Sequence, residues 1–184
     1  MSCAVGLKKL GAKPQQGRAH LVYSPSDRAT DATAAVVRLA DITDLPVLAP
    51  LIEHYWDFER ITGFNAARIT ALLTDLLREP NRGQTWVAQK GGFLVGYLLV
   101  AYLFSLEHGG LMAEIDEFFV IPENRALNIG AALLERATAA MAQRGITHVQ
   151  LQLGTNNPHG KRFYENHGFR ELSGYGLLHK SLQL

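Results

Sequence analysis

The sequence predicts a mixed α/β domain, with helices on both faces of a central sheet. Strand-like and helix-like segments follow one another from residue 34 in the order strand, two helices, three strands, helix, strand, helix and two strands. The 184 residues are the length of one domain, and a hydrophobic content of 47% is ordinary for a protein with one sizeable core. These observations favour a single domain over residues 34–184.

The first strand and helix are predicted close together. Residues 34–39 have a strand-like composition, and residues 41–55 carry leucine and isoleucine at helical spacing. Thr43 or Asp44 is the expected N-cap of the helix. Pro46 fits the first helical turn, where the N–H that proline lacks is not needed.

A second helix and a hairpin follow. Residues 65–78 predict the helix, which ends before Pro80 because the residue preceding a proline disfavours helical backbone. Residues 85–89 and 93–104 are rich in β-branched and aromatic side chains, as is typical of strands. The Gly91-Gly92 pair between them predicts a tight hairpin turn.

The second half of the chain alternates strands and helices. A strand is predicted over residues 114–120, and after a loop a helix over residues 131–144. Residues 146–153 alternate as a strand does, and residues 158–167 predict a short helix closed by Gly168. The last predicted elements are strands over residues 169–172 and 175–182.

Residues 1–33 are predicted to be a weakly ordered tail, because Gly, Lys, Gln, Ser, Pro and Asp recur there without an apolar period. A basic targeting arm is the alternative, whereas the continuous apolar stretch of a secretory signal is absent. The net charge is +1, and the first 30 residues carry five Lys or Arg against Asp27, so 5 − 1 = +4 there leaves +1 − 4 = −3 elsewhere. An acidic body argues against nucleic acid as partner and is compatible with a cationic substrate.

Several further classes of protein are disfavoured. No apolar run approaches the roughly 20 residues that cross a membrane. The single cysteine, Cys3, cannot form an internal disulfide, which fits the cytoplasm. The seven histidines show no metal-ligand spacing, so no metal is expected. Residues 154–161 resemble a nucleotide P-loop, but the spacing is one residue too long and Arg162 replaces the hydroxyl residue that binds magnesium.

The strand over residues 114–120 is unusual because it holds three carboxylates among large apolar side chains. Strand period predicts Glu114 and Asp116 on the face of Phe118, and Glu117 on the opposite face with Ile115 and Phe119. Half-buried carboxylates are costly unless they are paired, hydrated or used, so we expect a cleft beside this strand. The loop and helix start that follow would present free N–H groups and a positive dipole to a phosphate.

Three sequence blocks carry a family resemblance. They are D-E-F-F-V-I-P-E-N-R from Asp116 to Arg125, R-A-L-N-I-G-A from Arg125 to Ala131, and N-N-P-H-G-K-R-F-Y-E-N-H-G-F from Asn156 to Phe169. Together they resemble the GNAT superfamily of acetyl-CoA-dependent N-acetyltransferases, with Asn128 in place of the first glycine of the pyrophosphate motif. F-S-L-E-H-G-G followed by E-I-D-E-F-F-V looks most like the branch that acetylates polyamines and related small amines.

The resemblance implies a mostly antiparallel GNAT sheet with a splay between the strands at 114–120 and 146–153, in which pantetheine bonds to the main chain of Phe118 and Val120. Asn128 would preserve the turn, because asparagine tolerates left-handed backbone. The residues expected to bind acetyl-CoA are Phe118, Phe119, Val120, Arg125, Ala126, Leu127, Asn128, Ile129, Gly130, Ala131 and Asn157.

The resemblance also implies the catalytic groups. Tyr164 matches the usual general acid, and a phenol with pKa near 10 suits a departing thiolate whose thiol has pKa about 8.5. The alternative is that Tyr164 only packs its helix onto the sheet. Asp116 and Glu117, with Glu114 behind them, are the candidate bases for an acceptor ammonium. In the alternative, they attract the cation and water takes the proton.

The residues at 55–59 (Y-W-D-F-E) suit an amine through cation–π and charge attraction, or else Tyr55 and Phe58 belong to the core. The expected function is N-acetylation of a small cationic primary amine by acetyl-CoA, through direct transfer in a ternary complex. A protein Lys or N-terminal acetyltransferase and a non-catalytic acyl-CoA-binding module are the alternatives. A homodimer is compatible with the sequence.

Overall fold

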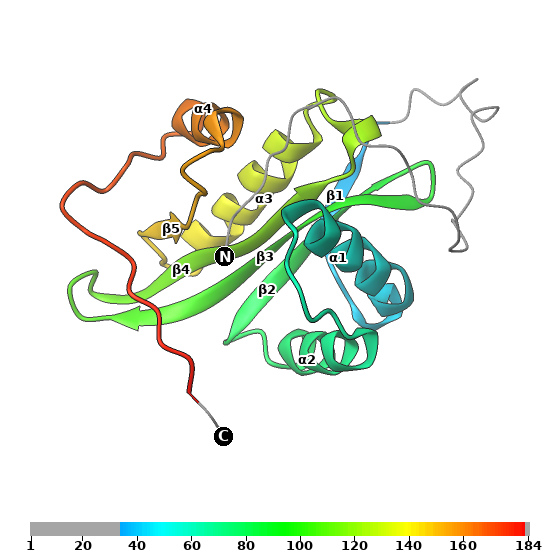
Figure 1. Ribbon diagram of the computed structural model, residues 1–184, viewed down its shortest axis with the longest axis horizontal. Coiled ribbons are helices and arrows are strands. Elements are labelled where there is room, and N and C mark those ends of the chain that lie inside the picture. The colour runs from blue at the N-terminus through cyan, green and yellow to red at the C-terminus, as the bar shows by residue number, and fades with distance from the viewer. Residues whose placement is uncertain (1–33, 183–184) are drawn as a thin grey trace.

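A five-stranded sheet in the order β1-β2-β3-β4-β5 organises the chain in the computed structural model, which describes residues 34–182. Strands β1 to β4 are antiparallel neighbours, and β5 lies parallel to β4 (Figure 1). The strands are β1 (Val36–Leu39), β2 (Gly83–Lys90), β3 (Phe93–Ser105), β4 (Gly110–Val120) and β5 (Val149–Leu151). The predicted mixed, mostly antiparallel sheet is confirmed.

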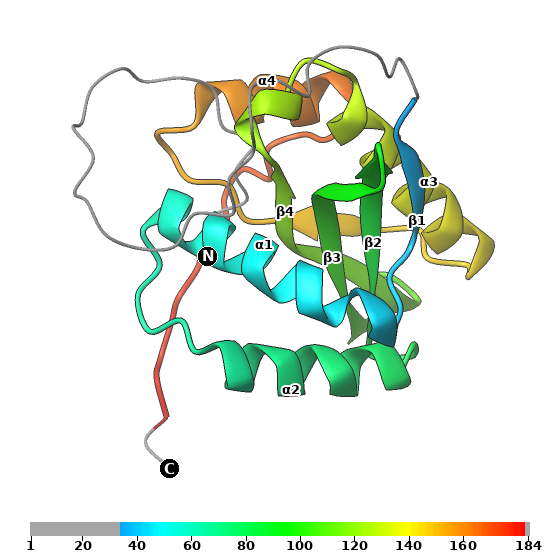
Figure 2. The ribbon, with the colours of Figure 1, turned by 90° about the vertical axis from the view of Figure 1, so that its right-hand side faces the viewer.

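Four α-helices cover the sheet among the described residues. They are α1 (Leu45–Glu59), α2 (Ala66–Arg78), α3 (Ile129–Gln143) and α4 (Pro158–Asn166). Two short 3₁₀ turns, Ile42–Asp44 and Pro122–Asn124, precede α1 and follow β4. Figure 2 shows α1 and α2 on one side of the sheet and α3 on the other, which confirms the prediction of helices on both faces.

The sheet separates two apolar cores, and neighbouring residues of one strand enter opposite cores. On β4, Phe118 belongs to the core beneath α3 and α4, whereas Phe119 belongs to the core beneath α1 and α2. On β3, Leu98 and Tyr97 divide in the same way. All four side chains are at most 1% exposed, so the sheet is buried on both faces at its centre.

A β-bulge interrupts β4. Leu99 of β3 pairs with Glu117, but the next residue, Val100, pairs with Ile115, so Asp116 is the extra residue. As a result Ile115 lies in the same core as Phe118 rather than with Phe119. The predicted face of Ile115 relative to those two phenylalanines is therefore wrong, because strict alternation ignores an inserted residue.

The last predicted strands are also wrong. Residues 169–172 and 175–182 form no strand, and the predicted strand at 146–153 is paired only over Val149–Leu151. Leu172, Tyr175 and Leu177 are each at least 69% exposed. A period-two pattern alone does not make a strand when no neighbour supplies a ladder.

The start of α1 differs in detail from the prediction. The side chain of Asp41 accepts a hydrogen bond from the Thr43 N–H and caps the 3₁₀ turn instead. Asp44 occupies the N-cap position of α1, one of the two predicted positions, but its carboxylate makes no cap hydrogen bond and is bound by Arg38 through both oxygens at 2.6 and 2.7 Å. This ion pair and the Asp41 N–H hold the pKa of Asp44 below its usual value.

Candidate active site

One edge of β4 is open over its second half. Strand β5 pairs only with Ala113–Ile115, while β4 continues to Val120 with β3 as its ladder partner among residues 34–182. The N–H of Ile121 donates to Val95 on the β3 side at 3.0 Å, so alternation directs the backbone groups of Phe118 and Val120 to the open edge. This is the predicted splay, created because β5 ends after three residues.

The turn after β4 leads directly into α3. Ala126 and Asn128 have φ of 66° and 61°, a left-handed conformation that favours glycine or asparagine. The first helical bond runs from Ala132 N–H to Asn128 O at 3.0 Å. The four N–H groups of Asn128–Ala131 donate to no other residue within 34–182, which makes the start of α3 suited to an anion.

Side chains of the turn contribute little to such a cradle. Ile129 and Ala131 are buried at 3% and 8% exposure, and Leu127 is half exposed. A β-carbon at Gly130 would lie 3.6 Å from Phe163, an ordinary contact that the protein alone would tolerate. Backbone groups are therefore what this turn can offer a ligand.

Arg125 fixes the turn instead of extending from it. Its Nε–H donates to Val120 O at 2.9 Å, and its backbone N–H donates to Pro122 O at 3.3 Å. The guanidinium lies 4.7 Å from the ring centre of Phe58 on α1 and 5.6 Å from that of Phe119. Burial lowers the pKa of Arg125, partly offset by the charges of Glu123 and Glu59. The arginine thus joins the turn to the end of α1.

Helix α4 places Tyr164 against the second half of β4. Asn157 caps the helix, with its Oδ1 accepting from the Gly160 N–H at 2.8 Å. A β-carbon at Gly160 would come within 2.8 Å of the Asn157 side-chain amide, so a larger residue there would displace the capping side chain. Tyr164 is 3% exposed, with its ring 6.4 Å from Phe118. The predicted acid therefore lies beside the strand segment with the open edge.

Glu117 is held by two neutral donors. The Trp56 indole N–H donates to Oε1 and the Tyr97 hydroxyl donates to Oε2, both at 2.8 Å. Burial raises the pKa of Glu117, although both hydrogen bonds oppose the rise and the charge of Asp116 adds to it. Because the donors come from α1 and β3, the carboxylate has one fixed orientation.

Asp116, the extra residue of the bulge, differs from Glu117 in its hydrogen bonding. Its half-buried carboxylate makes no hydrogen bond to any residue within 34–182. Burial raises the pKa of Asp116, and the negative charge of Glu114 raises it further. A carboxylate whose pKa is raised in this way is a stronger base than a carboxylate in water.

Glu114 connects β4 to β5. Gln150 donates to its Oε2 at 2.7 Å and Gln152 to its Oε1 at 3.1 Å. No Lys, Arg or His within residues 34–182 forms an ion pair with Glu114, Asp116 or Glu117. Sequence reasoning missed both glutamines, although their period of two in a predicted strand placed them on one face.

The structure separates the predicted residues at 55–59. Tyr55 is 1% exposed in the core beneath α1 and α2, so its core interpretation is correct. Trp56 reaches Glu117, and Phe58 reaches Arg125. Asp57 is exposed.

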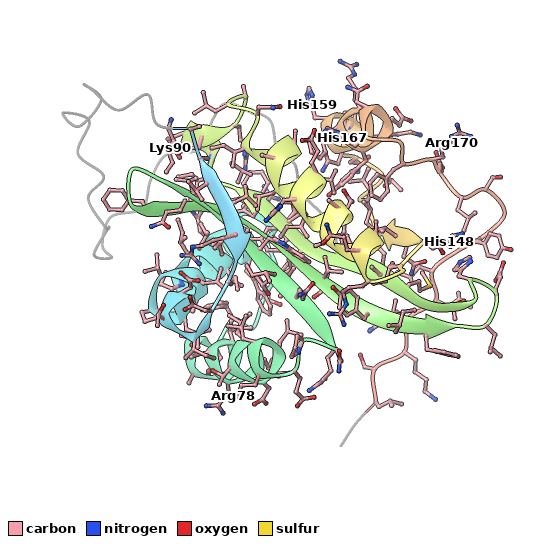
Figure 3. All side chains as sticks on the ribbon, turned by 180° about the vertical axis from the view of Figure 1, so that it is seen from behind. Arg78, Lys90, His148, His159, His167 and Arg170 are labelled. Atoms are coloured by element: carbon pink, nitrogen blue, oxygen red, sulfur yellow. The ribbon has the colours of Figure 1, made fainter. Side chains whose placement is uncertain are left out.

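Among residues 34–182, the His54 ring packs on Phe119 at 5.3 Å, and His108 stacks on His148 at 3.9 Å. Figure 3 labels His148 next to β5, and His159 and His167 on α4. Within residues 34–182, no three His, Cys, Asp or Glu side chains are arranged to hold a metal ion. In the same range, no helix has the length and apolar character needed to span a membrane.

A family model and a curated relative that match this chain are both described as acetyltransferases. A family model described as the acetyltransferase (GNAT) family matches residues 48–169, more than half of the chain. An uncharacterised N-acetyltransferase of Bacillus subtilis, YhfO, is 26% identical over 139 residues, which is 76% of this chain and 92% of that protein.

Two solved structures are similar. An integron cassette protein from the mobile metagenome of Cole Harbour Salt Marsh has 30% identity and a TM-score of 0.71, covering 80% of this chain and 91% of that one. A predicted acetyltransferase from Clostridium acetobutylicum, solved with acetyl-CoA, has 18% identity and a TM-score of 0.67, covering 79% of this chain and 96% of that one. At 18% identity, the similarity to the C. acetobutylicum protein shows a shared fold.

Proposed function

The chain belongs to the acetyltransferase (GNAT) family, and from this premise we propose that it transfers the acetyl group of acetyl-CoA to the primary amine of a small cationic acceptor. The observation that carries the choice of acceptor is the group of three carboxylates on β4, with Asp116 and Glu117 where its edge is open and Glu114 in the part paired with β5. Within residues 34–182, each of these carboxylates accepts hydrogen bonds from neutral donors only, or from none. No positive side chain in that range balances their negative charge, so a cationic acceptor would be favoured there.

The residues present fit acetyl-CoA. The N–H groups of Asn128–Ala131 lie at a helix start, where the dipole and free donors favour a pyrophosphate. The backbone of Phe118 and Val120 offers an extended edge to which an amide-containing pantetheine arm could bond as an added strand would. The C. acetobutylicum protein of the same fold was solved with acetyl-CoA. Phe119 and Asn157, also predicted to bind, would act through packing and the α4 cap.

The thioester supplies an activated acyl carbon. In direct transfer the amine nitrogen forms a bond to that carbon, the carbon–sulfur bond breaks, and the thiolate takes a proton. Tyr164 lies beside Phe118 and is the nearest predicted acid to the open edge. Its phenol, near pKa 10 in water, is suited to give that proton and regain one from solvent.

The acceptor must first lose a proton, because an alkylammonium has no lone pair to attack with. Asp116 and Glu117 stand on the strand that carries the open edge, and burial raises the pKa of both. A raised carboxyl pKa narrows the gap to the ammonium and favours general-base action. The same negative charges would concentrate a cationic amine at the site.

The test is an acceptor panel. Polyamines, monoamines, an aminoglycoside, and peptides with a free lysine or N-terminus are incubated with acetyl-CoA, while thiol release and product mass are followed. We expect small polycations to have the highest kcat/KM, and we expect 0.5 M salt to weaken it. Turnover confined to peptides would make the chain a protein acetyltransferase. Coenzyme A binding without turnover on any amine would make it a binding module.

A further inference from the structure

Two adjacent carboxylates on β4 have opposite environments. Glu117 has both oxygens occupied, by the Trp56 indole N–H and the Tyr97 hydroxyl at 2.8 Å each. Asp116 sits at the bulge, opposite no residue of β3, and accepts no hydrogen bond within residues 34–182. Glu117 is oriented by its neighbours, whereas no hydrogen bond from residues 34–182 orients Asp116.

The two side chains that bind Glu117 are themselves packed against neighbours. Tyr97 is fully buried on β3, with its ring 6.3 Å from that of Tyr55. Trp56 packs edge-on against Phe64 at 5.6 Å. The end of α1 is closed by Arg60 in a left-handed conformation, and Ile61 N–H returns to Trp56 O at 2.8 Å. Both donors therefore meet Glu117 without needing to reorganise.

We propose that Trp56 and Tyr97 are positioning residues that hold Glu117 as the fixed anion binding the acceptor's ammonium group, whereas Asp116 takes the proton. This division of labour rests on the proposed acetyl transfer to a cationic amine. Two neutral donors leave the carboxylate its full charge, and each oxygen keeps a second lone-pair direction for an ammonium N–H.

Asp116 suits proton removal for the complementary reason. No hydrogen bond from residues 34–182 favours its anion, whereas the two donors to Glu117 oppose protonation of that carboxylate. In the step, an N–H bond of the ammonium breaks, the proton joins an Asp116 oxygen, and the amine nitrogen keeps the electron pair with which it attacks. Asp116 then releases the proton to water. Within residues 34–182, the ionisable groups that act on this pair are Glu114 on β4 and Tyr97 on β3, besides the two carboxylates themselves.

Kinetics of three variants test the division. Trp56→Phe and Tyr97→Phe keep an aromatic ring and remove one donor each. We expect the KM for the amine to rise about 10–100-fold in each, the loss of a hydrogen bond to a charged group, with kcat within about threefold. Asp116→Asn should lower kcat about 10²–10⁴-fold and remove the acid limb of the pH–rate profile.

Phe64→Leu is the matched control, because it removes the ring contact to Trp56 and leaves the indole N–H in place. Its kinetic constants should stay within about threefold of wild type. If Trp56→Phe and Tyr97→Phe lowered kcat as far as Asp116→Asn does, with KM unchanged, Glu117 would be the base and the proposal would be overturned.

A second readout needs no turnover. Trp56 and Trp86 are the two tryptophans of the whole chain, so Trp86→Phe leaves an enzyme whose emission comes from Trp56. Its emission should titrate with Glu117, and Glu117→Gln should abolish the titration. Tyr97→Phe should shift the midpoint to higher pH, because a donor to the charged form is lost.

Adding a polyamine should shift the midpoint to lower pH, because a bound cation favours the carboxylate. A titration unaffected by Glu117→Gln, or by the polyamine, would overturn the proposal. If wild type acetylates no amine but the polyamine still shifts the midpoint, the proposed function fails, whereas cation binding at Glu117 survives.

Discussion

The two halves of the site are built from different material. The half proposed for the cofactor, the open edge of β4 and the turn into α3, presents backbone groups. The half proposed for the acceptor presents carboxylates oriented by side chains of α1, β3 and β5. Backbone groups depend on the path of the chain, whereas side-chain networks depend on each residue. Conservative substitutions should therefore be tolerated in the first half and damaging in the second.

Tyr164→Phe is the largest expected exception, because Tyr164 is a side chain in the backbone half. Loss of the phenol should lower kcat and kcat/KM together by about 10²–10⁴, since a general acid acts in the transition state. Coenzyme A affinity and melting temperature should be retained, because the ring still packs on Phe118. Single-turnover rates provide the measurement.

The adjacent residue supplies the control for that experiment. Phe163→Leu changes a ring 5.3 Å from Tyr164 without touching its hydroxyl. We expect a smaller loss of rate there, together with some loss of stability. A Tyr164→Phe enzyme with wild-type kcat in the chemical step would leave Tyr164 with a packing role.

The next largest effect is expected at Asn128, in the turn between β4 and α3. Asn128→Gly should preserve coenzyme A affinity, because glycine adopts the left-handed backbone without strain. Asn128→Val should weaken affinity by about 10-fold, since a β-branched residue at positive φ costs of the order of 1–2 kcal/mol. Calorimetric titration with coenzyme A measures both. Equal affinity of wild type for coenzyme A and for pantetheine would remove the phosphate role of the turn.

A substitution in the half proposed for the acceptor should raise the stability of the fold even though it lowers activity. Because the folded pKa of Asp116 is raised, folding favours its protonated form, and stability falls as pH rises from the unfolded value, about 3.9, through the folded value. Asp116→Asn should therefore raise the melting temperature at pH 7–8, by about 2–4 °C for each kcal/mol recovered. The gain should shrink toward pH 4. Thermal scans across pH would refute this if the gain were the same at every pH.

The smallest effect concerns the link between the halves. Phe58 on α1 lies under the Arg125 guanidinium, two residues after Trp56, which contacts Glu117. Phe58→Leu should weaken coenzyme A binding about 2–5-fold, the value of an exposed cation–π contact. A double-mutant cycle with Asp116→Asn measures coupling. Additivity within about 0.5 kcal/mol would mean that the halves are independent.

The order and type of most elements could be predicted from the sequence, because hydrophobic period and turn residues are local signals. Asn128 was correctly expected to accept left-handed backbone, but Ala126 was not, since alanine carries no such preference. The final strands failed because pairing partners, and not composition, decide whether an apolar segment becomes a strand.

The site was predictable as a neighbourhood and not as a network. Glu117 and the start of the turn lie on or directly after the second half of β4, and Tyr164 packs on Phe118 of the same segment, but their joint role in one site stays a prediction. The bonds from Trp56 and Tyr97 to Glu117 join residues 61 and 20 positions apart, which no local pattern encodes. The bulge at Asp116 is equally hidden, because only the partner strand reveals a skipped register.

That bulge has a consequence for insertions and deletions. Since Val100 and Leu99 pair with Ile115 and Glu117, removing Asp116 would give an unbroken ladder with every other pairing unchanged. Both cores would keep their side chains, so folding would not select against the shorter chain. Asp116 is thus the position at which a lineage could gain or lose chemistry by a single codon while its fold stayed the same.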